Sequence, residues 1–133
     1  MTTASGVNYW IRPNKSTNFN PEVKKLWDTK NTKQVGVGDK IIFYISGYKK
    51  FAGIAEVKSE MKDYEFELRL NEDDWVDVPP KDFLMNLDFV KERNFDFSKN
   101  KWKGLIFQST TKISKEDFTK LRDYILKHSR SAV

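Results

Sequence analysis

The feature that most constrains the fold is an apolar run at residues 41–45 (Ile-Ile-Phe-Tyr-Ile) that lies between two turn sequences. Residues 36–40 precede it with two glycines and an aspartate, a composition typical of a tight turn. Because the run is apolar on both faces of a strand, we expect a central strand that is covered on both sides. Residues 46–50 form a second turn, and residues 51–57 return as a strand. The sequence therefore predicts a β-hairpin, whose return strand can pack closely or bend at its small residues Ala52, Gly53 and Ala55.

Further strand patterns lie on both sides of this hairpin. Residues 7–12 are rich in β-branched and aromatic side chains, and Pro13, which lacks an amide donor, is expected to end that strand. Residues 64–70 alternate apolar with charged side chains, as a half-buried strand does. Short strands are also expected at residues 75–78 and 102–108. The sequence therefore predicts five to six strands, mostly antiparallel.

Helix signals are fewer. Residues 20–22 (Asn-Pro-Glu) are a helix start and predict a short helix to about Trp27. Residues 80–90 predict a short helix or turn, and Ser114 opens a C-terminal helix with apolar residues on one face. We therefore expect an α+β fold, a small β-barrel with helices packed around it, in a single domain over residues 1–133.

The chain contains few of the residues that commonly serve in catalysis. The chain has no cysteine and a single histidine, so thiolate sites, cysteine nucleophiles, His-ligated metals and His-based relays have almost no residues to form from. Gly36 and Gly38 precede a strand, whereas a phosphate loop needs a helix at that place. We expect a binding protein without catalytic residues, metal or cofactor. No long apolar stretch and no signal-peptide pattern is present, which favours a cytoplasmic protein without membrane contact.

Charge is distributed unevenly along the chain, whose net charge is +5. Residues 1–62 hold 11 basic and 5 acidic side chains, residues 63–96 hold 4 and 11, and residues 97–133 hold 9 and 3. If the fold joins the two basic segments, one face would attract a polyanion. A solvated, lysine-rich surface explains the same counts.

Several short blocks occur in the order typical of one family. They are Tyr9-Trp10-Ile11, Leu26-Trp27, residues 37–44, residues 51–57, residues 66–69, Val78-Pro79, residues 87–90, Trp102, Phe107-Gln108-Ser109, Ile113 and Glu116-Asp117-Phe118. In these blocks the chain resembles the EVE domain family, which is PUA-like and related to the YTH domains that read methylated adenine in RNA. The resemblance covers about residues 8–126. It implies a bent β-barrel with short flanking helices and a C-terminal helix.

The resemblance also implies a pocket at one end of the barrel that takes an extruded base between aromatic side chains. Trp27 matches the pocket tryptophan of the relatives, and the same rim would be lined by Asp28, Thr29 and Lys30. Without the resemblance, Trp27 is typical of a core residue that anchors its helix on the barrel, and both interpretations stand.

Further candidates stand at the ends of predicted strands. They are Arg12, Asn14, Lys15, Ser46, Gly47, Gln108 and Ser109. The first three occupy the place of polar contacts in the relatives, and the glycine allows close approach of a backbone. The last two stand where relatives have a glycine or another small residue, which leaves their role open. Ordinary loop and turn positions explain each group equally well. The other tryptophans are expected in the core: Trp10, Trp75 and Trp102.

The sequence therefore predicts a monomeric nucleic-acid-binding module that recognises a modified, methylated base flipped into an aromatic pocket, in RNA or DNA. Phosphate contacts are expected from Lys24, Lys25, Lys30, Lys33, Lys49 and Lys50. Two alternatives stay open, namely a small-molecule or nucleoside sensor and a protein-interaction module that reads no nucleic acid. The region after Trp27 departs from the motif of the better-known relatives, so the resemblance does not identify the ligand, and N6-methyladenine and modified cytosines in DNA both stay open.

Overall fold

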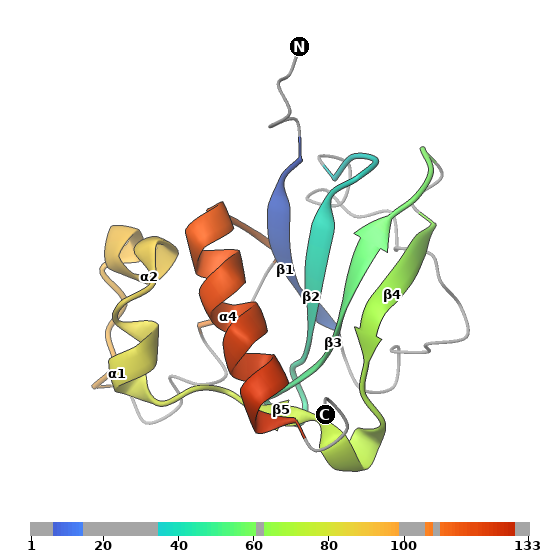
Figure 1. The fold of residues 1–133 in the computed structure, drawn as a ribbon. Helices are drawn as coiled ribbons and strands as arrows, with labels where there is room; N and C mark the ends of the chain where they lie inside the picture. The colour runs from blue at the N-terminus through green and yellow to red at the C-terminus, as the bar shows by residue number, and fades with distance from the viewer. Residues whose placement is uncertain (1–6, 15–34, 61–62, 99–105, 108–109, 130–133) are drawn as a thin grey trace.

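The computed structural model describes residues 7–14, 35–60, 63–98, 106–107 and 110–129 (Figure 1). The strands are β1 (Tyr9–Asn14), β2 (Lys40–Ile45), β3 (Lys50–Val57), β4 (Tyr64–Arg69), β5 (Val76–Asp77) and β6 (Thr111–Ile113). The helices are the 3-10 helix η3 (Glu72–Asp74), α1 (Lys81–Leu84), α2 (Asp88–Arg93) and α4 (Lys115–His128).

All described strands belong to one mixed sheet. Their order is β4-β3-β2-β1-β6, and β5 pairs with the start of β3. β1 and β2 are parallel, and the other pairs are antiparallel. The expected α+β class with a C-terminal helix is confirmed. Over the described strands the bent β-barrel is not closed, because β4 and β6 end the sheet on opposite sides and do not pair with each other.

The predicted hairpin is the centre of this sheet. β2 lies between β1 and β3, and every residue of β2 after Lys40 is buried. A register shift leaves Ala52 as an extra residue on β3, opposite Phe43 and Tyr44 of β2. A second shift leaves Glu67 as an extra residue on β4. Such bulges bend a sheet, as the small residues of β3 predicted.

The bulge on β4 changes which side chains share a face. The alternation in residues 64–70 predicts one apolar face, but Phe66 packs with one apolar cluster and Leu68 with the other. Gly53 lies against this bulge. A Cβ at Gly53 would come within 2.5 Å of the Leu68 carbonyl oxygen and 3.3 Å of the Phe66 ring. The close approach of β3 and β4 therefore requires glycine at this position.

The sheet separates the two apolar clusters. One lies between the sheet and the helices, where Ile42 and Tyr44 of β2 pack with Leu121 and Ile125 of α4. Figure 1 shows α1, α2 and α4 on this side of the sheet. The other cluster includes the alternate residues of β1 and β2 together with β3 and β4: Trp10, Ile41, Phe43, Ile45, Ala52, Ala55, Val57 and Tyr64. Because neighbouring side chains of a strand point to opposite faces, a central strand with both faces covered is apolar throughout.

A buried carboxylate joins β1 to the turn before β2. Asp39 is 1% exposed and accepts hydrogen bonds from the indole Nε1–H of Trp10 and from the amides of Asn8 and Gly36, at 2.8 to 2.9 Å. Gly38 in the same turn has a φ of 90°, which favours glycine. Trp10 is therefore a core residue, as predicted.

A second buried carboxylate links two helices. Ser114 caps α4 as predicted, since its Oγ accepts the amide N–H of Asp117 at 3.1 Å. The Asp117 carboxylate in turn accepts the amides of Asp88 at 2.8 Å and Phe89 at 3.0 Å. These amides belong to the first turn of α2, so the C-terminal helix caps α2 from outside.

Several boundaries differ from the predictions. β1 continues through Pro13, because β6 pairs only with residues 9–11 and the missing N–H of Pro13 therefore breaks no pairing on that side. The strand expected at 102–108 is contradicted at Ile106 and Phe107, which form a turn, and its other residues lie outside the described part. β6 is the sixth strand instead. Residues 80–90 contribute to two short helices, α1 and α2, and the helix expected at residues 20–27 lies outside the described residues. None of the described helices is long and apolar enough to cross a membrane.

Candidate nucleic-acid interface

The parallel strands β1 and β2 end side by side, and this end of the sheet gathers three predicted site residues. Asn14 ends β1 opposite Ile45, and Ser46 directly follows β2. The Asn14 carbonyl oxygen accepts hydrogen bonds from the Ser46 amide at 2.9 Å and from the Ser46 hydroxyl at 3.3 Å. Gly47 is the next residue of the same turn and is exposed. Asn14, Ser46 and Gly47 therefore lie together.

The side chain of Asn14 holds an acceptor that is not used within the described residues. Its Oδ1 is buried, and no described residue donates a hydrogen bond to it. Buried amide oxygens nearly always have a donor, because an unmet one costs on the order of 1–3 kcal/mol. The backbone of Asn14 holds Ser46, whereas its side-chain oxygen has no donor among the described residues.

Arg12 lies two residues before Asn14, on the same face of β1. Its side chain is buried, opposite Phe43 across the strand pair. Burial lowers the pKa of Arg12, and the nearby Tyr64 acts in the opposite direction. Burial likewise raises the pKa of Tyr64, while the charge of Arg12 lowers it. Since arginine stays protonated in proteins, the interior of this face carries a fixed positive charge.

Three aromatic rings pack together on the same side of the sheet. The ring centroids of Phe43 and Tyr64 are 5.0 Å apart, those of Phe43 and Phe66 are 5.8 Å apart, and those of Tyr64 and Phe66 are 5.4 Å apart. Packed rings of this kind form a rigid floor. The floor joins β2 to β4 on the face of the sheet that carries Arg12 and Asn14.

An aromatic pair of one exposed and one half-buried ring, which the sequence did not indicate, lies at the same end of the sheet. Tyr48 is 52% exposed and follows Ser46 by two residues. Its ring centroid lies 5.6 Å from that of Trp75. Trp75, expected in the core, packs against both apolar clusters but is only half-buried, and its Nε1–H donates to the Leu70 carbonyl oxygen at 3.3 Å. The signal for this pair is an aromatic residue in a turn that otherwise holds serine, glycine and lysine.

The other predicted site residues lie outside the described residues. They are Lys15, Trp27, Asp28, Thr29, Lys30, Gln108 and Ser109. Their place in a pocket therefore stays a prediction. Of the lysines predicted to contact phosphate, two are described: Lys49 is exposed, and Lys50 lies 3.9 Å from the Asp77 carboxylate.

Trp75 also lines a polar cavity of about 320 Å³ between β5 and the end of α4. Its charged and polar lining consists of Lys50, Asp73, Asp74, Asp77, Tyr124 and His128. Three carboxylates beside one lysine repel a phosphate, so this cavity does not suit the nucleic-acid backbone. Over the described residues, no three His, Cys, Asp or Glu side chains are placed to hold a metal ion.

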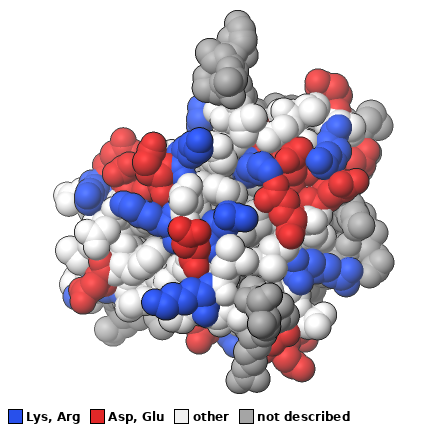
Figure 2. All heavy atoms as spheres, in the orientation of Figure 1, with Lys and Arg blue, Asp and Glu red and all other residues white. Residues whose placement is uncertain are grey.

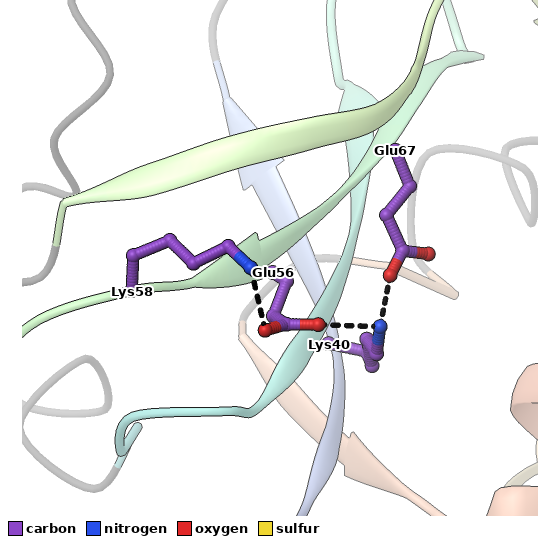
Figure 3. Close-up of polar contacts among 4 residues, drawn as sticks. All are labelled: Lys40, Glu56, Lys58 and Glu67. Atoms are coloured by element: carbon purple, nitrogen blue, oxygen red, sulfur yellow. Dashed lines mark hydrogen bonds and ion pairs between the residues drawn. The ribbon is translucent and has the colours of Figure 1, made fainter.

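Some of the basic charge of the first segment is neutralised on the sheet. Lys40 donates hydrogen bonds to Glu56 at 2.7 Å and to Glu67, and Lys58 donates to Glu56 at 2.9 Å (Figure 3). Burial alone would lower the pKa of Lys40, but its bonds to the two glutamates outweigh this and raise it. On the face that carries α4, basic and acidic side chains are intermixed (Figure 2). Phosphate contacts are therefore not expected from Lys40 or Lys58.

Comparisons with known proteins agree with the resemblance found in the sequence. The family model described as the EVE domain matches residues 8–124. A comparison with curated proteins gave no match.

Three solved structures have a similar fold. A protein from Agrobacterium tumefaciens has a TM-score of 0.52 and 17% identity, over 89% of this chain and 92% of that one. A protein from Leishmania major has a TM-score of 0.58 and 16% identity, over 94% and 98%. The YTH domain of the Zygosaccharomyces rouxii MRB1 protein, in complex with N6-methyladenosine RNA, has a TM-score of 0.53 and 11% identity, over 94% and 90%. At such identities the likeness establishes the fold alone.

Proposed function

Since the chain belongs to the EVE domain family, with residues 8–124 matched, we propose that it is a nucleic-acid-binding module that recognises a modified base in RNA or DNA. In this proposal a methylated base leaves its stack and enters a pocket at the end of β1 and β2, and no catalytic step follows. The similar fold of a YTH domain whose structure holds N6-methyladenosine RNA supports this class of ligand.

The observation that carries the proposal is the buried Oδ1 of Asn14, which has no donor among the described residues. An amide oxygen is a suitable acceptor for an exocyclic amino group on the edge of a base. Methylation of that amine once leaves one N–H to donate. The Ser46 hydroxyl next to Asn14 supplies a second polar group at the same strand ends.

Two further features suit a flipped nucleotide. Arg12, buried two residues before Asn14 on the same face of β1, is proposed to make a polar contact to that nucleotide. Trp27 is the residue proposed to stack on the base, with Asp28, Thr29 and Lys30 on the rim. Lys15, Gly47, Gln108 and Ser109 complete the proposed contacts. Lys49 is available for a phosphate on the exposed turn after β2.

The test is to incubate the purified protein with fragmented RNA and DNA from its source cells and to quantify the recovered nucleosides by mass spectrometry. We expect one modified nucleoside to be enriched by the wild type and the enrichment to be lost in both Asn14→Ala and Trp27→Ala. Salt-sensitive binding of unmodified nucleic acid should persist in both variants, because phosphate contacts are independent of the pocket. Met85→Ala is the matched control, since Met85 is 50% exposed and lies at the end of α1.

Unchanged enrichment in Asn14→Ala and Trp27→Ala would refute the pocket assignment. Recovery without enrichment would reduce the protein to a general nucleic-acid binder. No recovery, together with binding of free modified nucleosides in calorimetry, would instead support a nucleoside sensor.

A further inference from the structure

We propose that Tyr48, with Trp75 packed against it at a tilt of 50°, forms a stacking platform for a second base, the one that neighbours the flipped base in the bound strand. This inference rests on the proposed function and specifies which class of nucleic acid the protein binds. The ligand would be a single-stranded segment of at least two nucleotides, because an isolated nucleoside has no base for this platform.

The first support is the exposure of Tyr48. The large hydrophobic side chains that are clearly exposed among the described residues are Val37, Tyr48 and Met85, and Tyr48 is the aromatic one. The clustered rings of Phe43, Tyr64 and Phe66 are buried or half-buried. An aromatic ring that stays half in water offers its surface to a partner.

The second support is that the platform is held in place before any ligand arrives. The amides of Tyr48 and Lys49 both donate to the Ile45 carbonyl oxygen, at 3.2 and 2.8 Å. Lys49 has a φ of 56°, and its carbonyl oxygen accepts the amide of Val78 at 3.3 Å. Trp75 is held through its bond to Leu70. A ring whose backbone is held and which packs on Trp75 loses less conformational entropy when a base stacks on it.

The third support is the position of Tyr48 relative to the proposed pocket. Tyr48 follows Ser46 by two residues, and Ser46 is hydrogen-bonded to Asn14 through both its amide and its hydroxyl. When a base flips out, its neighbours lose a stacking partner. An aromatic side chain beside the pocket replaces that partner, and it does so for any base, since each base has a π-face.

The charges around the platform indicate a base and not the sugar-phosphate backbone. Asp73 and Asp74 directly precede Trp75, and their carboxylates repel phosphate. Lys49 directly follows Tyr48, is exposed, and is available to contact a phosphate. We therefore expect the strand to place a base face on the rings and its phosphate near Lys49.

The test measures binding of single-stranded RNA and DNA probes of about nine nucleotides, a length typical of single-strand binders. The central base is N6-methyladenine, 5-methylcytosine, or the unmodified adenine or cytosine. In two further probes of each kind, an abasic site replaces the 5′ neighbour or the 3′ neighbour of the central base. We expect Tyr48→Ala to weaken binding of the complete probe about tenfold, as for loss of one stacked base, and Tyr48→Phe to leave it unchanged. For one of the two abasic probes, wild type and Tyr48→Ala should bind equally. Met85→Ala is again the control.

A second readout places 2-aminopurine at the neighbouring position. Its fluorescence should be quenched on binding to the wild type and to Tyr48→Phe, and much less on binding to Tyr48→Ala, since quenching reports stacking. Equal affinity and equal quenching for wild type and Tyr48→Ala would overturn this inference and leave the proposed function intact. Failure of the wild type to bind any probe would overturn both. A lysine-rich peptide that binds through Tyr48, with probe affinity unchanged in Tyr48→Ala, would overturn the inference and assign the rings to a protein partner.

Discussion

Replacing Asp39 with alanine is expected to lower the free energy of unfolding by about 4 kcal/mol, because this carboxylate accepts three N–H groups. The indole N–H of Trp10 is buried, and leaving it without an acceptor costs about 1–3 kcal/mol. The bonds from the amides of Asn8 and Gly36 are partly buried, so water can replace the acceptor and each loss costs about 0.5–1.5 kcal/mol. The midpoints give the stated total, a large part of the roughly 5–15 kcal/mol by which domains are stable.

Asp39→Asn keeps a polar side chain of the same shape, so it separates the loss of one hydrogen bond from the loss of all three. Oδ2 of Asp39 accepts both Trp10 and Gly36, whereas Oδ1 accepts Asn8. An asparagine keeps two bonds if its oxygen faces Trp10 and Gly36 and its amide group faces Asn8. We therefore expect Asp39→Asn to cost about 1–2 kcal/mol, for one lost bond and the lost charge.

Urea unfolding followed by circular dichroism measures both variants, with the free energy taken from the midpoint and the slope. Asp82→Asn is the matched control, because Asp82 is exposed. If Asp39→Ala stays within about 1 kcal/mol of the wild type, the three bonds do not stabilise the link between β1 and the turn before β2. If Asp39→Asn costs as much as Asp39→Ala, the orientation argued above is wrong.

Two other predictions concern β3. Gly53→Ala should lower the free energy of unfolding by about 2 kcal/mol or more, because its Cβ would meet a backbone oxygen of β4 at 2.5 Å, whereas Gly36→Ala, with no atom within 4 Å of the added Cβ, should change it little. Equal urea midpoints for these two variants would contradict the close approach of β3 and β4. The pKa of Glu56 is lowered by its hydrogen bonds from Lys40 and Lys58, so the native state binds its proton less readily than the unfolded state does. The stabilisation from Glu56 should therefore be complete above pH of about 4.5 and decline below it, and thermal melts of Glu56→Gln should lack this part of the acid dependence. Parallel curves of melting temperature against pH for the wild type and Glu56→Gln would contradict this contribution of Glu56.

Local patterns predicted much of the fold. The hairpin of β2 and β3 follows from an apolar run between two turns, and α4 follows from Ser114 and the spacing of its apolar residues. These signals need only neighbouring residues, so they can be read from a sequence. Local patterns could not predict that β4 and β6 stay unpaired or that Ile106 and Phe107 form a turn, since strand partners are distant in the chain.

The candidate site was predicted in part. Asn14, Ser46 and Gly47 were proposed through the family resemblance, and the structure brings them together at the ends of β1 and β2. Tyr48 and Trp75 were not proposed as a pair, because one lies in the turn after β2 and the other beyond β4, and no local pattern joins them. The burial of Arg12 was not predicted either, since a charged residue at a strand end is normally exposed.

By itself, the sequence determined the central hairpin, the C-terminal helix and the scarcity of residues for catalysis or metal binding, because spacing and residue inventory are properties of the chain alone. Only the tertiary structure decided that β1 lies parallel to β2, that the bulge at Glu67 sends Phe66 and Leu68 to different clusters, and that Asp39 accepts Trp10. Each of these features depends on which distant segments pack together. That packing is favoured because it buries the apolar side chains on both faces of one sheet.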